Sequence, residues 1–547
     1  MMRLLGPPLL RSITPLAALA VLAGCAATGP VDVLQQALTP AQPDEAVEEI
    51  IAIEPLVAPD PYAVDPVFDV GYSRISDIYL RSVDLGDLTV DGLAGLSDID
   101  PAFTARRSDG DVELLVDNQV VSRLAGAEAT DNDAWAAVLT TAVTQSRVTS
   151  PLIAESDTEA VYEAVMDAII ADLDEYSRYV DPEEAEAERA SRDGYGGVGL
   201  LLNFDEAAGT GFVEDVFEGS PAEDAGMRVG DVFVAVDGVS TVGWTLPDLA
   251  RELRGPIGTT VTVTIRSVDA PNLRTLTLRR AQVIVDTVES EVRDGIGIMR
   301  ISRFNAGTLD QARTVLGELL AQLRRIGGTG LIIDLRGNPG GLLDQSVGLA
   351  DLFIEGGDII TTRGRHPDSF QRFPAGSGDV ARGLEIVVLI DSRSASGAEI
   401  VAAALQDTGR AVVVGSSSFG KGSVQTVSRL PNGGELFLTW SRIYGPAGIT
   451  IHRQGVTPTI CTSNGLTDAD QVLQAFRAGE IPTPDRLLRQ RQLAADDDAA
   501  LEELRSACPW REHNSDLDVD VAIALLQDSA LYARALTTAP AAALAAR

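Results

Sequence analysis

TGLIIDLRGNPGGLLDQSVGLADLFI, residues 329–354, contains two apolar runs of different length. The first, TGLIIDLRG, is short and predicts a buried strand, whereas LLDQSVGLADLFI has the length and spacing of a helix. The glycines and the proline of GNPGG favour a tight turn between them. A strand that leads through a tight turn into a helix is the first half of a βαβ unit, and it indicates a parallel sheet.

The same alternation extends in both directions over residues 283–460. Because βαβ crossovers bring the helix N-termini to one edge of the sheet, ligands of such sheets bind at that edge. We therefore expect an α/β core here, with the functional site in its strand-to-helix turns. The further predicted strands are GIGIMRIS, EIVVLIDS and AVVVG, and the further predicted helices are LDQARTVLGELLAQLRRI and AEIVAAALQD.

A serine and a lysine stand near these turns. Ser396 lies in DSRSASGAEI between a predicted strand and a predicted helix, and Lys421 lies between two glycines in FGKGS. A serine hydroxyl needs a nearby base to become a nucleophile, and a lysine whose amine is kept neutral by burial can be that base. The alternatives are a helix N-cap for Ser396 and a solvated surface charge for Lys421.

Neighbouring residues supply the other parts of an acyl-transfer site. The turn that contains Gly340 and the amide of Gly397 can each present a backbone N–H to a developing oxyanion. Gln425 follows the lysine by four positions, so it shares a face with the lysine in a helix or a strand and can orient its amine. The three histidines have no comparable setting, and we expect them to be surface or packing residues: His366, His452 and His513.

Residues 191–282 change to short β-type runs separated by glycines. The stretch GSPAEDAGMRVGDVFVAVDG combines a short helix, a glycine and a strand that ends in an Asp-Gly turn. The region resembles a PDZ domain of the circularly permuted kind found in bacterial proteases. This resemblance implies that the terminal carboxylate of a peptide binds in the GGVGL loop and that the peptide backbone pairs with the adjoining strand. The implied peptide-binding residues are Gly196, Gly197, Val198, Gly199, Leu200 and Arg254, with an exposed salt-bridge partner as an equal interpretation of Arg254.

The first residues have the pattern of an export signal. Two arginines, a short apolar run and the sequence LAGC lead to Cys25. The run is too short to span a bilayer, and LAGC resembles the lipobox of bacterial lipoproteins, in which residues 1–24 are removed and Cys25 is acylated. We therefore expect a periplasm-facing lipoprotein of the cell envelope, at the outer rather than the inner membrane. A plain secretory signal and an uncleaved anchor are the alternatives.

Three regions carry no predicted chemistry. Residues 25–61 are rich in alanine, proline and acidic residues and predict a flexible tether. Residues 62–190 and 461–547 show helical periodicity and predict helical regions before the PDZ domain and after the core. If lipid occupies Cys25, the remaining cysteines, Cys461 and Cys508, either form a disulfide in an oxidising compartment or stay as buried thiols.

The chain of 547 residues carries a formal net charge of −37. A strongly acidic surface repels phosphate groups, so nucleic acid is excluded as a partner. The serine–lysine chemistry requires neither a metal ion nor another cofactor.

The ordered motifs are similar to those of one known family. YGGVGL, GSPAEDAGMRVGD, DLRGNPGG, SASGAEIVAAALQDTGRAVVVG, FGKGSVQT and GVTPTI resemble motifs of the carboxyl-terminal processing proteases, tail-specific serine peptidases of family S41. The similarity covers roughly residues 155–460. It implies a multi-domain α/β fold, in which a protease core with a sheet of the crotonase and ClpP kind carries an inserted PDZ domain. The resemblance assigns the nucleophile to Ser396, the base to Lys421, the partner of the lysine to Gln425, and the oxyanion amides to Gly340 and Gly397.

This resemblance also implies a function. The chain would be an endopeptidase that cleaves proteins near their C-termini after its PDZ domain has bound the free tail. Protein tails are then its partners, and a second copy of the chain or an adaptor lipoprotein is a further expected partner. The alternative is a catalytically silent PDZ adaptor or scaffold lipoprotein that binds protein C-termini. The segment LDEYSRYVDP lacks the proline-histidine pair common in the family, which leaves its packing open.

Overall fold

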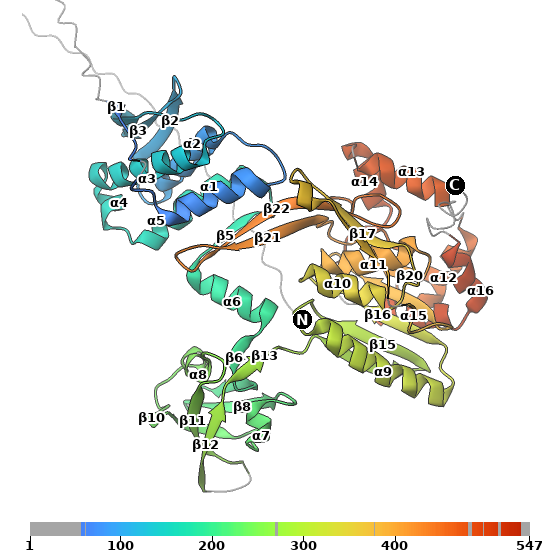
Figure 1. Cartoon of the computed structure of the whole chain (residues 1–547). Helices are drawn as coiled ribbons and strands as arrows, with labels where there is room; N and C mark the ends of the chain where they lie inside the picture. Colours follow the sequence, from blue (N-terminus) through green and yellow to red (C-terminus); the bar gives the residue numbers. More distant parts are fainter. Residues whose placement is uncertain are drawn as a thin grey trace, which may run out of the picture. The chain divides into compact units, whose positions relative to one another are not determined.

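The computed structural model describes residues 56–60, 62–268, 272–376, 378–479, 484–495, 497–511 and 516–537. The predicted signal segment 1–24, Cys25 and His513 lie outside these residues. None of the described helices is long and apolar enough to cross a membrane. Figure 1 shows the chain coloured along its sequence.

A six-stranded sheet forms the centre of the predicted core. Its first pair of strands is antiparallel, and the other pairs are parallel, in agreement with the βαβ pattern. Parallel strands are buried on both faces, which explains their nearly continuous apolar sequences. In spatial order the strands are β14 (Val288–Arg293), β15 (Ile296–Ile301), β16 (Gly330–Asp334), β19 (Glu385–Ile390), β20 (Val412–Gly415) and β23 (Ile460–Cys461).

Helices cover both faces of this sheet. Successive strand residues point to opposite faces, so each strand contributes side chains to both cores. Ile333 and Val388 belong to the hydrophobic core on one face, and Ile332 and Val387 belong to the core on the other. The first face is covered by α9 (Thr308–Ile326), α10 (Leu343–Asp351) and α11 (Gly397–Asp407), and the second by α12 (Ala469–Ala478), α15 (Asp516–Leu526) and α16 (Ser529–Leu536).

The core also contains an antiparallel sheet that the sequence pattern did not predict. Its long strand β22 (Glu435–Tyr444) pairs with β21 (Ser423–Arg429), β17 (Asp358–Arg363) and β5 (Arg178–Val180), and β18 (Gln371–Pro374) extends it beyond β17. Lys421 comes directly before β21, whereas Ser396 follows β19. The candidate nucleophile and base therefore come from two different sheets.

The region 62–190 contains helices, as the sequence predicts, and also strands that the sequence analysis did not predict, so it is α/β. The strands β2 (Phe103–Ser108), β3 (Asp111–Val116) and β4 (Gln119–Leu124) form an antiparallel meander. Asp109 with Gly110, and Asp117 with Asn118, have the positive φ angles that two-residue hairpin turns require. The other elements named here are β1 (Leu56–Val57), which pairs with β4, and the helices α1 (Pro66–Ile78), α2 (Leu85–Ala94), α3 (Asn132–Thr149) and α5 (Thr158–Ala171).

The PDZ region contains its own sheet and hydrophobic core. The strands follow the spatial order β12 (Leu273–Arg279), β11 (Thr260–Arg266), β9 (Val232–Val236), β8 (Thr210–Val216) and β7 (Leu200–Asp205), so that β7 is an edge strand. Leu249 and Leu253 of α8 (Leu246–Leu253) share a hydrophobic core with Leu200. Gly196 and Gly197 belong to β6 (Tyr195–Gly197), which pairs with β13 (Ala281–Val283).

The C-terminal region contains a covalent link in addition to its helices. Cys461 and Cys508, 47 positions apart, form a disulfide. Cys508 follows α14 (Asp498–Ser506), which is preceded by α13 (Pro484–Ala494). The link therefore joins this segment to the last strand of the core sheet.

Candidate active site

Ser396 stands between β19 and α11 in an unusual backbone conformation. Its backbone angles, φ of 51° and ψ of −111°, lie outside the regions that residues other than glycine normally adopt. Hydrogen bonds hold this turn, because Ala395 N–H donates to Asn338 O at 2.9 Å and Ser396 N–H donates to Glu399 Oε2 at 2.8 Å. The serine side chain is thereby presented at the N-terminus of α11.

Lys421 lies between two glycines that the packing requires. Gly420 has a φ of 98°, and a Cβ on Gly422 would lie 2.0 Å from His452 N. The amine of Lys421 is 5.4 Å from the centre of the Tyr176 ring. Burial lowers the pKa of Lys421 from its usual 10.5, and the positive charge of Arg178 lowers it further. The site therefore favours a neutral amine.

Lys421 is also the single lysine among the 43 basic residues of the chain, all the others being arginines. An arginine guanidinium stays charged in proteins, whereas a buried lysine can lose its proton. Lys421 is therefore the one Lys or Arg side chain of this sequence that can readily lose its proton. This count is the clearest signal in the sequence for a basic catalytic group.

Glu399 joins the segments that carry Ser396 and Lys421, and it was not identified from the sequence. Its fully buried carboxylate accepts four hydrogen bonds, from Ser396 N at 2.8 Å, Lys421 N at 2.9 Å, Gly420 N at 2.7 Å and Ser418 Oγ at 2.5 Å. Burial raises the pKa of Glu399 to about 7, although the hydrogen bonds oppose this effect. The spacing Ser-x-x-Glu, typical of a helix capping box, was the available signal.

The backbone N–H groups near Ser396 that are free to donate differ in part from the predicted pair. Gly340 lies against the serine, since a Cβ on Gly340 would be 2.7 Å from Ser396 Cβ, but its own N–H donates to Asn338 Oδ1 at 2.8 Å. Phe304 N–H donates to Gly340 O at 2.9 Å, which turns the N–H of Gly341 to the opposite side of the trans peptide. Within the described residues, the N–H groups of Gly341 and Gly397 donate no hydrogen bond.

Gln425 lies on β21, after a bulge in its pairing with β22. Its Nε2 donates to Ser423 Oγ at 2.9 Å and to Thr439 Oγ1 at 3.3 Å, and Thr439 Oγ1 donates to Asp174 Oδ1 at 2.9 Å. These contacts fix the amide and leave its Oε1 as the atom that can accept a hydrogen bond from the lysine. No such bond to Lys421 is present among the described residues.

One cavity of about 580 Å³ brings the predicted residues together. Within the described part of the chain, no hydrogen bond joins Ser396 Oγ to Lys421 Nζ. The residues of the predicted site that line the cavity are Ser396, Lys421, Gln425, Gly340 and Gly397, and Gly341 lines it as well.

The helix α6 (Pro182–Asp193) forms one wall of this cavity, to which it contributes Glu188, Ser191 and Arg192. Arg189 and Arg192 pair with the fully buried Glu435 of β22 at 3.1 and 3.3 Å. The helix ends at the start of the PDZ region. The segment that connects the PDZ region to the core is therefore itself part of the candidate active site.

A separate cavity of about 310 Å³ lies in the PDZ region. It runs along the edge strand β7 and the helix α8, and its apolar lining includes Phe217, Leu246 and Ala250. The guanidinium of Arg254 lies 4.5 Å from the centre of the Tyr195 ring. Of the six predicted peptide-binding residues, Gly197, Val198, Gly199, Leu200 and Arg254 line this cavity, whereas Gly196 does not.

The two described histidines are not placed to serve Ser396. His366 accepts a hydrogen bond from Asp368 N at 3.2 Å near the surface. Burial lowers the pKa of His452 to about 4, and its Nδ1 lies 2.7 Å from the guanidinium of Arg442. In the part of the chain that the structure describes, no cluster of acidic, histidine or cysteine side chains is arranged to hold a metal ion.

Comparison with known proteins agrees with this geometry. Residues 295–462 match the family model "Peptidase family S41", and residues 212–267 match that of the PDZ domain. A carboxy-terminal-processing protease of Bartonella bacilliformis is 35% identical over 323 residues, which cover 59% of this chain and 74% of that protein. The chain belongs to peptidase family S41. A carboxyl-terminal-processing protease of Picosynechococcus is 32% identical over 305 residues, 55% of this chain and 72% of that protein.

Among solved structures, this S41 peptidase is similar to a photosystem II D1 C-terminal processing protease. The match has 27% sequence identity and a TM-score of 0.35, and it covers 69% of this chain and 92% of the other. The combination of an S41 core with a PDZ domain is that of the C-terminal processing serine proteases. The S41 match supports a catalytic function and does not favour the silent adaptor.

Proposed function

We propose that this S41 peptidase hydrolyses peptide bonds near the C-termini of proteins with a Ser396–Lys421 dyad. The observation that carries the proposal is the convergence of Ser396, the single lysine and two glycine N–H groups in one cavity. The buried carboxylate of Glu399 holds the backbone on both sides of this pair. The dyad needs only a neutral lysine and an approach of its amine to the hydroxyl.

In the first step, neutral Lys421 accepts the proton of the Ser396 hydroxyl while the serine oxygen attacks the carbonyl carbon of the substrate. The tetrahedral oxyanion accepts hydrogen bonds from Gly397 and Gly341, and each such donor is worth about 3 kcal/mol of barrier. The lysine ammonium then protonates the leaving amine, and the acyl-enzyme remains. A water molecule, deprotonated by the lysine, hydrolyses this ester and regenerates the dyad.

The PDZ cavity supplies the recruitment step. Its groove between β7 and α8 has an unpaired strand edge that can take up an extended peptide as a further strand. The terminal carboxylate of the peptide binds at the loop 198–199, and the apolar lining accepts the last side chain. The upstream part of the same tail reaches the core cavity, where it is cut.

One experiment tests both peptide cleavage by the dyad and recruitment of the free C-terminus by the PDZ region. A flexible peptide with a free C-terminal carboxylate, and the same peptide amidated, are incubated with wild type, Ser396→Ala, Lys421→Ala and Lys421→Arg. We expect scission of the free peptide by wild type alone, because arginine cannot give up its proton. Ser506→Ala, at an exposed serine, is the matched control and stays active. Scission by Lys421→Arg at the wild-type rate would exclude the lysine as the base.

The location of the enzyme is a separate proposal. The sequence LAGC before Cys25 supports removal of residues 1–24, acylation of Cys25 and attachment to the periplasmic side of the envelope, at the outer membrane. Mass spectrometry of the N-terminal fragment would detect the acyl chains. Cys25→Ser should release the protein into the soluble periplasmic fraction. A variant that still sediments with membranes would contradict the lipid anchor.

A further inference from the structure

The segment 508–511, which follows α14, lies against both loops that carry the dyad. Ser417, four residues before Lys421, donates a hydrogen bond from its Oγ to Cys508 O at 2.7 Å. Ser392 N–H and Ser416 Oγ donate to Arg511 O at 3.4 and 3.3 Å. One short stretch of backbone thus accepts hydrogen bonds from the nucleophile loop and from the base loop.

Side chains of the same segment reinforce this contact. The Trp510 ring stacks on the ring of Phe419, which lies two residues before Lys421. The ring centres are 6.3 Å apart, and the ring planes are 8° from parallel. Arg505, at the end of α14, donates to Phe419 O at 3.3 Å and lies 4.7 Å from the centre of the Trp510 ring. Phe419 and Trp510 are 40% and 50% exposed, so these contacts lie at the surface and are individually weak.

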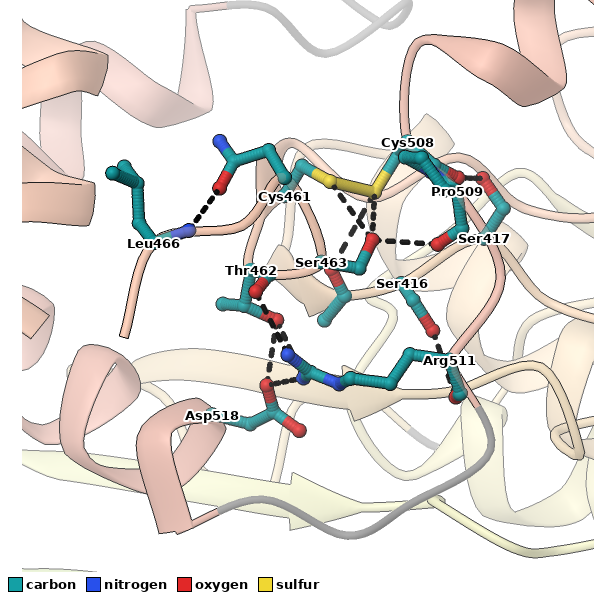
Figure 2. The surroundings of a disulfide bond; sticks show 12 residues. Ser416, Ser417, Cys461, Thr462, Ser463, Leu466, Cys508, Pro509, Arg511 and Asp518 are labelled. Atoms are coloured by element: carbon teal, nitrogen blue, oxygen red, sulfur yellow. Dashed lines mark hydrogen bonds and ion pairs between the residues drawn. A yellow bond between two sulfur atoms is a disulfide. The ribbon is translucent and has the colours of Figure 1, made fainter. Parts of the chain in front are cut away.

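The disulfide fixes the segment to the core sheet (Figure 2). Cys461 belongs to β23, and Cys508 begins the segment. Ser463 Oγ donates to Pro509 O at 2.6 Å beside it. The disulfide is the covalent attachment of the segment to the core sheet.

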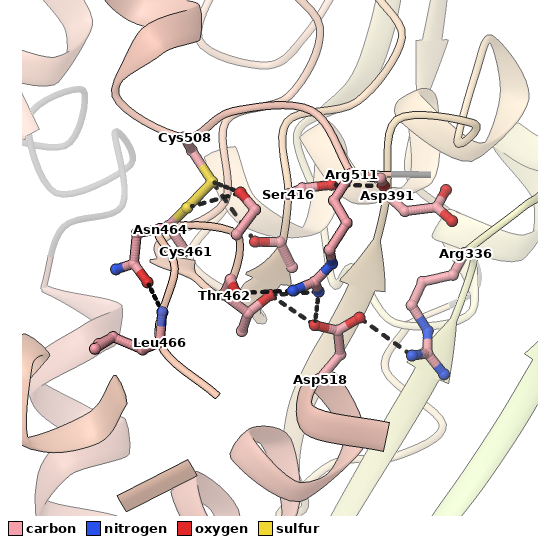
Figure 3. Close-up of polar contacts among 12 residues, drawn as sticks. Arg336, Asp391, Ser416, Cys461, Thr462, Asn464, Leu466, Cys508, Arg511 and Asp518 are labelled. Atoms are coloured by element: carbon pink, nitrogen blue, oxygen red, sulfur yellow. Dashed lines mark hydrogen bonds and ion pairs between the residues drawn. A yellow bond between two sulfur atoms is a disulfide. The ribbon is translucent and has the colours of Figure 1, made fainter. Parts of the chain in front are cut away.

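A third connection leads to the turn that contains Arg336 and precedes Gly340 (Figure 3). The Arg511 guanidinium donates to Thr462 O at 2.7 Å and pairs with the buried Asp518. The other oxygen of Asp518 pairs with Arg336 at 3.2 Å, in the turn that precedes Gly340. The segment is therefore connected to all three loops of the candidate site.

We propose that the segment 508–511 positions the catalytic loops, and that the Cys461–Cys508 disulfide makes peptidase activity dependent on the redox state. The inference rests on the proposed function of the dyad. Neither cysteine touches the substrate cavity, so the effect acts through the placement of Ser396 and Lys421. Because a displacement of about 1 Å can reduce catalysis on the order of 100-fold, loss of this support lowers turnover rather than tail binding.

The redox step needs a two-electron reductant, for which a dithiol is the probe. A thiolate of the dithiol attacks Cys461 Sγ, which is half-buried, and the S–S bond breaks with Cys508 as the leaving thiolate, which takes up a proton. The second thiolate of the reagent then attacks the mixed disulfide. Cys461 leaves as a thiol, and the reagent is oxidised to its cyclic disulfide.

The experiment compares the full chain in its oxidised form, after reduction with dithiothreitol, and after reoxidation. Mass spectrometry monitors the bond. We expect reduction to lower kcat about tenfold or more with KM and binding of a tail peptide to the PDZ region unchanged, and reoxidation to restore kcat. The double variant Cys461→Ser/Cys508→Ser should have the low kcat and no response to dithiothreitol. A reduced enzyme with full kcat would overturn the inference.

Hydrogen exchange gives a readout that needs no turnover. Reduction should increase exchange in residues 392–397 and 416–421 and leave residues 200–266 unchanged. Unchanged exchange in the catalytic loops, or unfolding of the whole core, would overturn the positioning role even if the enzyme proved inactive. Trp510→Ala should lower kcat with the disulfide intact, and Trp510→Phe, which keeps a stacked ring, should restore it. Failure of the proposed function is seen separately, as oxidised wild type that does not cleave.

Discussion

Ser396 carries backbone strain that its surroundings maintain. A non-glycine residue with a φ of 51° and a ψ of −111° costs on the order of 1–3 kcal/mol. The hydrogen bonds at Ala395 and Ser396 over-determine this conformation, and Gly340 leaves room for it. The strain fixes the direction of the hydroxyl, which a nucleophile requires.

We predict that Ser396→Gly is more stable than Ser396→Ala. Both variants lose the hydroxyl and should be inactive, but only glycine adopts this φ without strain. The expected difference in the free energy of unfolding is about 1 kcal/mol, since the greater freedom of glycine in the unfolded chain offsets part of the gain. Calorimetry of the two variants measures it. A glycine variant that melts below the alanine variant would contradict the assignment of strain.

Lys421 should give the enzyme a rising pH profile. The amine accepts a proton only when neutral, and its pKa is lowered from 10.5, so kcat/KM should rise with pH and level off at an inflection below 10.5. Because the chain has one lysine, reductive methylation with a ¹³C label gives a single lysine NMR signal that titrates at this pKa. Arg178→Leu should move the inflection upward, and Arg372→Leu, at an exposed arginine, should not.

Glu399 offers a test of the link between the two catalytic segments. In Glu399→Gln, one carboxylate oxygen becomes an NH₂ group, which faces N–H or hydroxyl donors at either position. Removal of hydrogen bonds to a charged group costs about 1.5–3 kcal/mol, so kcat should fall by one to two orders of magnitude. Peptide cleavage assays measure this effect. Glu318→Gln, at an exposed position, is the control. Full activity of Glu399→Gln would exclude the positioning role.

At the scale of single residues, the sequence identifies the candidate catalytic side chains but not the residues that hold them in place. The serine, the lysine and Gln425 follow from chemistry and family motifs, and one cavity contains all three. Three of the four hydrogen bonds of Glu399 span 19 to 22 positions and depend on a contact that only the fold creates, whereas the one from Ser396 N spans three positions. The exchange of Gly340 for Gly341 as the free donor depends on the rotation of one peptide, which residue types do not encode.

Among the elements, the parallel strands were predictable and the antiparallel ones were not. Buried parallel strands have short apolar sequences that are easily recognised. The meander β2–β3–β4 mixes charged and apolar residues, and its signals were the two-residue turns at Asp109-Gly110 and Asp117-Asn118. In the hairpin of β21 and β22, β21 is partly exposed and both strands contain polar residues, so the apolar pattern is weaker.

The contact between α6 and β22 provides a prediction at the level of elements. In Glu435→Gln, the fully buried carboxylate loses its charge. Arg189 and Arg192, which are 23% and 21% exposed, then lose this ion pair, and Arg192 keeps its pair with Asp193 at 3.0 Å. We expect a loss of stability of about 2 kcal/mol, below that of a fully buried ion pair because water still reaches the arginines. Thermal unfolding measures it, with Glu291→Gln of an exposed pair as the control. An unchanged melting temperature would show that α6 is held by other contacts.

For the whole molecule, we expect the disulfide to increase the free energy of unfolding, in addition to its proposed role in positioning the loops that carry Ser396 and Lys421. It closes a stretch of 47 positions, for which the chain-entropy relation gives about 4 kcal/mol. The core transition of Cys461→Ser/Cys508→Ser, followed by calorimetry, should therefore occur several degrees lower, and the transition of the PDZ region should not move. Equal shifts of both transitions would indicate that the two regions unfold together.

The cover on the second face of the core sheet has a consequence for the newly made chain. Strand residues such as Ile332 and Val387 are fully buried only once α15 and α16, as well as α12, have packed on this face. Tyr532 completes this cover by a hydrogen bond to Ile386 O at 2.8 Å. A polypeptide emerging from the ribosome therefore has to wait for residues 516–537 before its peptidase core can close. Synthesis itself thus delays closure of this face of the sheet until residues 516–537 have been made.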